Sequence, residues 1–331
     1  MATTYLVSVY IMSEINILYT FDSKFYKLAA VSMSSVLMHA NPDTHCHIYC
    51  MVSRGTHGRR FMRKIAKRYG ADFTWKIVSN WRNPYKKFDF SRWSPVIFYR
   101  LFAHRVFPKL DKILYLDSDT IVCSDLSEMY NSDISEYTLA AVRDMAPIHN
   151  SRGYAPGQYV CSFADKYMNR APYVNSGVLL LNLKRLSDAQ EKLLATDIKL
   201  NYPDQDMLNY CLYDKIKLLD LKYNFAPGVP IPRFFPKNQI QDARMSPVII
   251  HFYTVKPYYF NVRARDMYSR FFHAAHEIGL HPSDLKEHEE KYNRKRARTK
   301  TIFPFVRIRN ENVFFFGMKI TSPNKKGKNR K

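Results

Sequence analysis

The sequence has no long apolar run. No stretch of its 331 residues reaches the roughly 18 to 20 apolar residues that a membrane-spanning helix needs. No Lys or Arg precedes Lys24, so the N-terminus also has no basic segment of the kind that opens a secretory signal. These absences argue against a membrane-spanning helix and favour residues 1–14 as a short extension before the first strand.

Cysteine is scarce. The five cysteines are odd in number and scattered, which does not predict a disulfide framework and favours a reducing compartment. Cys46 and Cys50 lie four residues apart, but no histidines accompany them at the spacing of a zinc site. The sequence therefore predicts no structural role for disulfides or zinc.

The glycine-rich motifs of nucleotide-binding proteins are missing as well. There is no Gly-x-x-x-x-Gly-Lys and no Gly-x-Gly-x-x-Gly, and the hydrolase motifs His-Glu-x-x-His and Gly-x-Ser-x-Gly are also absent. If the chain binds a nucleotide, its phosphates must be held by a metal ion and side chains rather than by a glycine-rich loop.

Positive charge, by contrast, is abundant. The net charge is +22, and residues 286–331 hold 15 Lys and Arg residues against 4 Glu, which is half of the excess. The densest runs are Arg294–Arg298 and Asn324–Lys331. Such a region attracts polyanions such as an anionic membrane leaflet, nucleic acid or an acidic glycan. The alternative is a solvated and partly disordered tail.

Strand-like and helix-like stretches alternate along most of the chain. The predicted strands are Ile15–Thr20, Cys46–Val52, Asp72–Val78, Lys112–Leu116, Thr138–Val142, Gly177–Leu183, Ile216–Leu221 and Val248–Tyr253. The predicted helices are Lys24–His39, His57–Tyr69, Pro95–Phe107, Lys184–Leu200 and Asp204–Tyr213. This alternation predicts an α/β domain with a largely parallel sheet. The pattern weakens beyond Tyr268, so we expect the main domain to end near Leu280.

Two acidic residues follow one of the predicted strands. Asp117-Ser118-Asp119 comes directly after the apolar residues 113–116. On an extended segment, residues two apart point to the same side, and two carboxylates there can share one hard cation. A chain of this length contains about one Asp-x-Asp by chance, so the position at a strand end carries the prediction.

A second such triplet is Asp204-Gln205-Asp206, which opens the predicted helix. Acidic residues in a first turn complement the helix dipole, and this is one interpretation. The other is that these polar side chains face a sugar.

His251 and Lys256 are the remaining candidates from the residues themselves. His251 ends the apolar run Val248–Ile250, where it is either a hydrogen-bonded structural residue or a third ligand for Mn²⁺ beside two carboxylates. Lys256 precedes Pro257 and is either a surface lysine or a cation that meets a phosphate.

Taken together and in order, several segments resemble glycosyltransferase family 8, in particular its bacterial lipopolysaccharide core hexosyltransferases. The resemblance runs from about Asn16 to Tyr259. The matching segments are Trp93–Phe102, Asp111–Ile121, Tyr173–Lys184, Tyr202–Asn209, and His251 with Lys256-Pro257. It implies a GT-A, Rossmann-like fold for residues 15–280, followed by a basic C-terminal region at residues 281–331.

The resemblance also implies roles for individual residues. Asp117, Asp119 and His251 would bind Mn²⁺ or Mg²⁺. Gln205 would lie where the family has a residue proposed to face the reacting carbon, and Asp204, beside the hexose, is the carboxylate to be tested against it as the catalytic group. The residues that would contact a UDP-glucose or UDP-galactose donor are Thr20, Asp22, Arg100, Asp117, Ser118, Asp144, Asn175 and Lys256. Among them, Asp22 would meet the uracil and Lys256 the diphosphate. The family retains anomeric configuration, by a covalent or a same-face route.

The sequence departs from the family pattern at two places. The family usually has His-x-x-Gly-x-x-Lys-Pro-Trp near the end of the domain. Residues 251–258 lack this glycine and are one residue shorter. Lys24 stands where many members carry a polar amide.

The main hypothesis is a retaining hexosyltransferase acting on a surface glycan or glycolipid acceptor such as lipopolysaccharide core. It would work in the cytoplasm, on the inner face of the cytoplasmic membrane, with the basic region docked on anionic lipid. One alternative is a haloacid dehalogenase-type phosphohydrolase, because residues 113–120 resemble its strand and Asp-x-Asp motif. That motif usually opens its domain, however. A basic nucleic-acid-binding protein is the other alternative, although charge alone gives nonspecific binding and we expect no specific nucleic acid.

Overall fold

The computed structural model of the chain describes residues 13–78, 94–145, 172–195, 202–253, 256–259 and 266–298, with short segments at 300–303, 306–309, 312–315 and 318–321. The chain divides into two compact units, Met1–His281 and Pro282–Lys331. Most of the predicted N-terminal extension and residues 322–331 lie outside the described residues.

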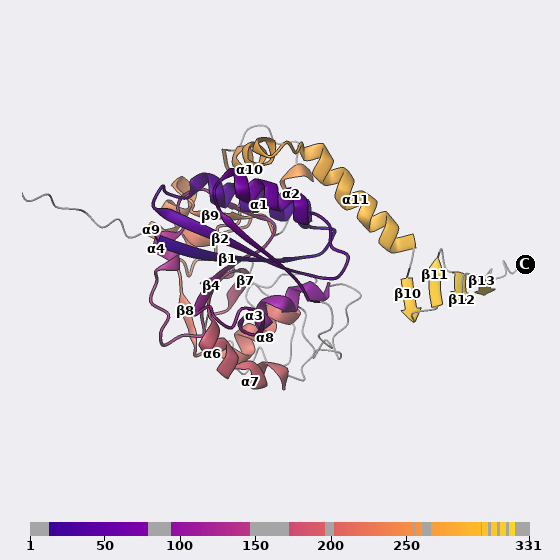
Figure 1. Cartoon of the computed structure of the whole chain (residues 1–331). Helices are drawn as coiled ribbons and strands as arrows, with labels where there is room; N and C mark the ends of the chain where they lie inside the picture. Colours follow the sequence, from indigo (N-terminus) through magenta and orange to yellow (C-terminus); the bar gives the residue numbers. More distant parts are fainter. Residues whose placement is uncertain are drawn as a thin grey trace, which may run out of the picture. The chain divides into compact units, whose positions relative to one another are not determined.

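A seven-stranded sheet forms the centre of the first unit, in the order β3-β2-β1-β4-β7-β6-β8 (Figure 1). Its strands are β1 (Ser13–Phe21), β2 (Thr44–Val52), β3 (Asp72–Ile77), β4 (Lys112–Leu116), β6 (Leu139–Arg143), β7 (Val174–Asn182) and β8 (Ile216–Leu218). β1 pairs in parallel with β2 and β4, β2 with β3, and β6 with β8. β7 runs antiparallel to both of its neighbours. The prediction of a mostly parallel central sheet is thus confirmed.

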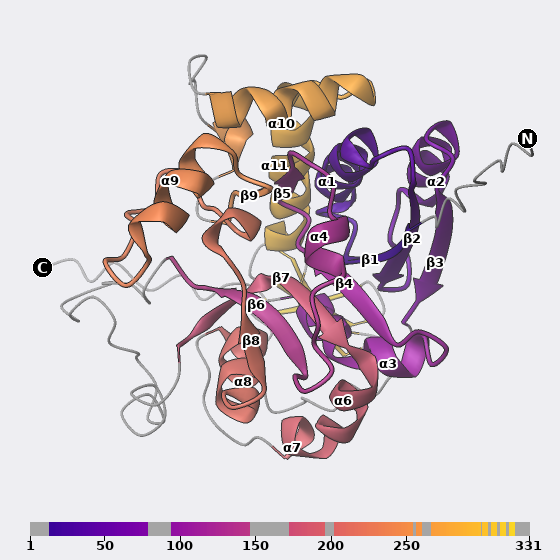
Figure 2. The same cartoon turned by 90° about the vertical axis from the view of Figure 1, so that its left-hand side faces the viewer.

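Helices cover both faces of this sheet (Figures 1 and 2). One face carries α1 (Tyr26–His39), α2 (Arg59–Arg68), α4 (Ser127–Tyr130), α9 (Lys237–Met245) and α10 (Asp266–Glu277). The other face carries the 3₁₀ helix η1 (Pro95–Phe102), α3 (Ala103–Val106), α6 (Leu183–Asp188), α7 (Gln190–Leu194) and α8 (Pro203–Leu212). Two further 3₁₀ turns are η2 (Leu221–Tyr223) and η3 (Pro257–Tyr259).

The strands are apolar on both sides because each face is covered. In β1, Ile17 and Tyr19 pack into the core under α1, whereas Leu18 packs into the opposite core with Phe98 and Tyr115. Side chains of a strand alternate between faces, and a sheet covered on both sides therefore needs a continuous apolar run. The apolar runs in the sequence are the direct consequence of this layered arrangement.

A small second sheet closes one end of the domain. β5 (Thr120–Val122) pairs antiparallel with β9 (Ile249–His251), so that Thr120 lies opposite His251. β9 lies within a predicted strand, but β5 was not predicted. The predicted helix Lys184–Leu200 differs too, because α6 and α7 replace its first part and residues 196–200 lie outside the described residues.

The second unit contains α11 (Pro282–Arg298) and an antiparallel sheet of four strands in sequence order. These strands are β10 (Lys300–Phe303), β11 (Val306–Arg309), β12 (Asn312–Phe315) and β13 (Met318–Thr321). The docking role of this basic region stays a prediction. Across the residues that the structure describes, no helix is both long and apolar enough to cross a membrane.

Candidate active site

A tight turn, rather than an extended segment, carries the first acidic triplet. β4 ends at Leu116, and the backbone N–H and side-chain hydroxyl of Thr120 both donate to the carbonyl of Asp117, at 3.3 and 2.9 Å. The expected same-side geometry of an extended strand is therefore wrong at this point. The two carboxylates instead converge because β5 pairs with β9, and Phe252 N donates to the carbonyl of Asp119 at 2.9 Å.

Asp117, Asp119 and His251 form a compact group of potential metal ligands. One ligand atom from each lies within 4.8 Å of the others. His251 Nε2 lies 3.2 Å from Asp119 Oδ1 and 3.7 Å from Asp117 Oδ2. His251 is almost fully buried, whereas the side chain of Asp117 is 28% exposed, so the group is open on one side. Two carboxylates and an imidazole suit a divalent cation such as Mn²⁺.

Two buried asparagines orient the imidazole. His251 Nδ1 lies 2.9 Å from Asn224 Oδ1, and Asn224 Nδ2 donates to Asn175 Oδ1 at 3.0 Å. An amide oxygen only accepts hydrogen bonds, so Nδ1 carries a proton and Nε2 is the nitrogen that faces the carboxylates. Nε2 can bind a cation in place of the proton that it shares with Asp119. With that proton replaced, Nε2 and the two carboxylates would be three electron-pair donors around one point, which is the fit that a metal site requires.

The absence of a side chain at position 177 makes room for this group. A Cβ on Gly177 would lie 2.1 Å from His251 Cε1 and 2.7 Å from Asp117 Oδ2. Any other residue would therefore collide with two of the three ligands. Gly177 was not among the predicted site residues. A glycine inside a buried strand, where close approach of another group is one explanation, was the signal that could have found it.

Lys256 lies beside the acidic pair despite the shortened loop. Its Nζ contacts Asp119 Oδ2 and donates to the carbonyl of Phe252 at 3.1 Å. Burial raises the pKa of the Asp119 carboxyl, but the charges of Lys256 and His251 outweigh this effect and hold the pKa well below its usual range. Asp119 is therefore an anion at any physiological pH.

A buried arginine links the turn to the start of α8. The guanidinium of Arg100 lies 3.1 Å from Asp117 Oδ1 and 3.6 Å from Asp204 Oδ2, and it stacks at 4.0 Å over the ring of Tyr115. Burial lowers the pKa of Arg100, but Tyr115 and the two carboxylates raise it above its ordinary value. Burial raises the pKa of Asp204, and Arg100 offsets part of this shift.

Gln205 is held at both ends of its amide. Its Oε1 accepts from the backbone N of Ser176 at 2.9 Å, and its Nε2 donates to Asp144 Oδ2 at 2.8 Å and to Tyr173 Oη at 3.1 Å. Asp144 also accepts from Tyr253 Oη at 3.3 Å. Gln205 and Asp144 are both buried, so this network fixes their orientation.

The two aspartates of the second triplet have different environments. Asp204 Oδ2 accepts from Ser176 Oγ at 3.1 Å, beside Arg100. Asp206 instead accepts from Tyr173 Oη at 2.6 Å and from the backbone N of Tyr202 at 2.9 Å. Both lie in the first turn of α8, as the dipole interpretation predicts, but both are also buried in polar networks.

The remaining predicted donor contacts lie at different distances from this network. Thr20 Oγ1 lies 3.3 Å from the hydroxyl of Tyr115, which in turn donates to Asp117. Asp22 has other hydrogen-bond partners than this network: its carboxylate accepts from Lys24 N at 2.9 Å and from Ser94 Oγ at 3.0 Å. Ser118 lies within the turn and is partly exposed.

A surface pocket of about 480 Å³ lies elsewhere in the first unit. It is lined by Phe225, Pro227, Gly228, Val229, Pro230, Ile231, Arg244, Met267 and Tyr268. None of these belongs to the predicted site, and the side-chain chemistry of the Asp117 group is the better guide to function.

Curated relatives of the chain are named as glycosyltransferases. The chain is 27% identical over 221 residues to the lipopolysaccharide 1,2-glucosyltransferase of Escherichia coli K12, covering 63% of this chain and 62% of the relative. It is 26% identical over 222 residues to a putative glycosyltransferase of Haemophilus influenzae, covering 64% and 63%. The chain thus spans less than two thirds of the length of either relative.

Solved structures share the fold. The galactosyltransferase LgtC, in complex with donor and acceptor sugar analogues, has a TM-score of 0.62 at 20% identity, covering 83% of this chain and 100% of that one. The bifunctional glycosyltransferase WbbM has a TM-score of 0.64 at 19% identity, covering 87% and 53%. These likenesses confirm the predicted GT-A fold. The model of the family described as glycosyl transferase family 8 matches residues 16–260. The resemblance inferred from the motifs is confirmed, and the chain belongs to glycosyl transferase family 8.

Proposed function

We propose that the chain is a retaining, metal-dependent hexosyltransferase that moves glucose or galactose from a UDP-sugar to a surface glycan such as lipopolysaccharide core. The convergence of Asp117, Asp119 and His251 is the observation that carries this proposal. Family membership supports it, as do the printed names of the relatives. No contact in the described residues favours the phosphohydrolase or the nucleic-acid-binding alternative.

The metal would be Mn²⁺ or Mg²⁺, held by Asp117, Asp119 and His251. When bound, a divalent cation neutralises the charge that develops on a leaving diphosphate. Lys256 would add a second positive charge on the same side, because its Nζ already lies against Asp119. Thr20 and Ser118 would contact the donor close to this group, while Asp22 would meet the uracil at the end of β1.

The hexose would lie over the polar network that joins η1, β7 and α8. Breaking a sugar–phosphate bond builds positive charge on the sugar ring, which buried carboxylates can stabilise. Asp204 and Asp144 supply such carboxylates, and Arg100 and Asn175 hold the surrounding groups in place. Asp204 and Gln205 are both candidates for the group that faces the reacting carbon. Asp204 would act by a covalent route.

The covalent route can be tested by mass spectrometry of the protein after it has been mixed with UDP-sugar in the absence of acceptor. A covalent route predicts a peptide containing Asp204 that is heavier by one hexosyl group, and its loss in Asp204→Asn. A same-face route predicts unmodified protein together with steady UDP release.

The acceptor would be a glycan or glycolipid at the inner face of the cytoplasmic membrane. The basic residues of the second unit would contact the anionic leaflet, since each Lys or Arg close to such a surface contributes about 1 kcal/mol. Binding to phosphatidylglycerol vesicles that weakens steeply with salt is the expected behaviour. Equal binding to neutral vesicles would contradict it.

The proposal is tested by measuring release of UDP from UDP-glucose and UDP-galactose with Mn²⁺ and with a chelator. Asp119→Asn should reduce release by about 100-fold or more, because the metal contributes several kcal/mol of transition-state stabilisation. Asp214→Asn is the matched control, since Asp214 is exposed and its substitution removes the same charge. Release that persists in the chelator, or in Asp119→Asn, would contradict the metal role.

A further inference from the structure

Helix α2 (Arg59–Arg68) has an unusually basic composition. Its sequence, RRFMRKIAKR, contains six basic residues and no acidic residue. All six are exposed, namely Arg59, Arg60, Arg63, Lys64, Lys67 and Arg68. Met62, Ile65 and Ala66 are buried and pack into the core of the first unit. The helix is therefore anchored by its apolar side and presents a fully cationic side to solvent.

The six cations lie on one half of the helix surface. Residues three or four apart lie on the same side of a helix. The spacing of Arg59, Arg63 and Lys67 forms one row, and that of Arg60, Lys64 and Arg68 forms the adjacent row. Only Arg68 has an ion pair with a described residue, Glu277 at 3.4 Å on the neighbouring helix α10. We call these six residues the basic face of α2.

The first turn and the like-charged rows of this arrangement work against the stability of the helix, although Lys67 and Arg68 in the last turn complement its dipole. Like charges four residues apart repel each other, and cations in the first turn oppose the helix dipole. Arg59 and Arg60 occupy that first turn, and no acidic residue is present there. Because the basic face adds nothing to the core, an anionic partner outside the chain explains it better than folding does.

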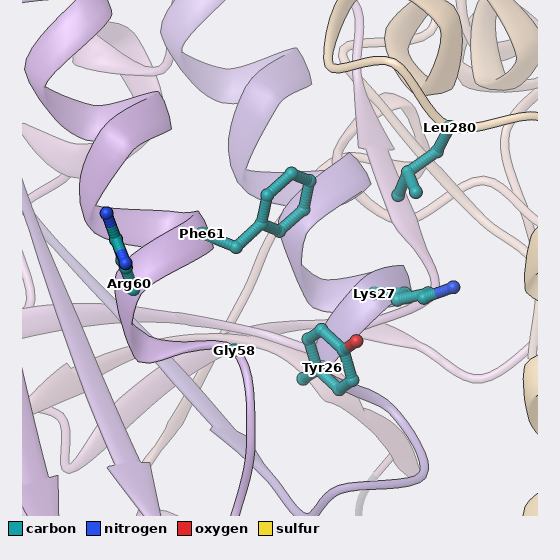
Figure 3. Close-up of a pocket in the computed structure, with 6 residues that line it drawn as sticks. All are labelled: Tyr26, Lys27, Gly58, Arg60, Phe61 and Leu280. Atoms are coloured by element: carbon teal, nitrogen blue, oxygen red, sulfur yellow. The ribbon is translucent and has the colours of Figure 1, made fainter.

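An apolar hollow lies next to the basic face. Tyr26, Phe61 and Leu280 line a pocket of about 350 Å³, together with Lys27, Gly58 and Arg60. Figure 3 shows Phe61 projecting from α2 towards α1, with Tyr26 and Lys27 at the start of α1 and Leu280 on the chain that follows α10. Cationic side chains beside a recessed apolar surface match an amphiphile with an anionic headgroup, and this combination favours a lipid bilayer over nucleic acid.

The start of α2 is connected to the loop after β1, which contains Asp22. Ser23 Oγ accepts from the backbone N of His57 at 3.1 Å and donates to the carbonyl of Gly55 at 3.2 Å. The loop after β1 is thereby joined to the loop that leads into α2. A bilayer bound to the basic face would consequently lie beside the end of β1.

We infer that the basic face of α2, with the adjacent hollow, docks the protein on the surface of an anionic phospholipid bilayer. This surface belongs to the first unit and is distinct from the basic second unit. None of its residues belongs to the candidate active site, so the inference stands or falls independently of the donor and the acceptor.

Lysine footprinting on the full-length chain tests the inference directly. The chain is acetylated with an amine-reactive reagent, with and without vesicles of phosphatidylcholine and phosphatidylglycerol, and modification is read by mass spectrometry. Lys64 and Lys67 should be protected several-fold by these vesicles and not by phosphatidylcholine alone. Lys109 and Lys184 are exposed elsewhere in the first unit and should react equally under all conditions. Protection confined to lysines of the second unit would overturn the inference.

A pair of matched variants gives an independent test. Arg59→Gln, Arg63→Gln and Lys67→Gln combined should weaken binding to anionic vesicles by about ten-fold or more. The control combines Lys109→Gln, Lys184→Gln and Lys237→Gln, which remove the same charge from exposed positions outside α2. UDP release from free donor should be unchanged in both variants, which separates this inference from the proposed function. Equal weakening in both variants, or stronger protection of Lys64 by duplex DNA than by vesicles, would refute lipid docking.

Discussion

At the scale of single residues, the metal group depends on neighbours that do not bind metal themselves. Asn224 sets the proton position of His251, and Gly177 leaves the space that His251 and Asp117 occupy. Lys256 shares the carboxylate of Asp119. Each of these three residues can be replaced without removing a metal ligand, so each substitution tests how its contact contributes to metal binding.

Replacing Gly177 by alanine should strongly weaken metal binding without unfolding the chain. The added Cβ would overlap His251 and displace Asp117. We expect Mn²⁺ affinity, measured by calorimetric titration, to fall by about 100-fold, at the upper end of what disturbing the surroundings of a ligand costs. Gly55→Ala is the control, because nothing lies within 4 Å of its Cβ position, although its φ of 79° is unfavourable for alanine. That variant should lose some stability and keep its metal affinity.

Replacing Asn224 by alanine should weaken metal binding by about 10- to 100-fold, because Nδ1 of His251 loses the acceptor that fixes its tautomer. Asn224→Asp keeps an acceptor oxygen and should retain most of the affinity. If the two variants bound Mn²⁺ equally well, Asn224 would have no part in orienting the imidazole.

Lys256→Met should affect metal and donor binding in opposite directions. Removal of the ammonium frees Asp119, so Mn²⁺ should bind more tightly in the absence of nucleotide. With UDP-sugar present, the KM for donor should rise because a cation near the diphosphate is lost. Titrations with and without UDP measure the two effects. A fall in metal affinity without nucleotide would contradict this role.

At the scale of secondary structure, the first turn of α8 combines a structural and a functional residue. Asp206 binds Tyr173 and the backbone of Tyr202, whereas Asp204 faces Arg100. Asp206→Ala should therefore lower the free energy of unfolding by about 1–3 kcal/mol, because it leaves buried donors unpaired. Urea denaturation measures this loss.

Asp204→Asn should show the reverse pattern. Burial raises the pKa of Asp204, which means that its charge is costly to bury, so neutralising it should change stability little. UDP release should fall strongly if Asp204 stabilises the reacting sugar. Equal effects of the two variants on stability and on activity would contradict the division of roles.

At the scale of the whole molecule, the α/β order was predictable because both faces of the sheet are covered. Continuous apolar runs such as residues 15–20 and 112–116 are typical of such strands, and both lie in the sheet. β5 could not be predicted in the same way, because three residues are too few to show a hydrophobic pattern and their pairing partner is more than a hundred residues away. The candidate metal ligands followed from family order, whereas Gly177 and Asn224 matter only through contacts with the distant His251.

The central claim is that Asp117, Asp119 and His251 together hold a divalent cation. Pulsed electron paramagnetic resonance of the Mn²⁺-loaded chain tests it most directly, because nitrogen coordinated to Mn²⁺ modulates the spin echo. The structure predicts a modulation from one imidazole that disappears in His251→Gln and is unaffected by His39→Gln. His39 is not a member of the Asp117 group, and its Nδ1 lies 2.8 Å from the carbonyl oxygen of Ser35. A modulation that persists unchanged in His251→Gln, or the absence of Mn²⁺ binding in the unmodified chain, would contradict it.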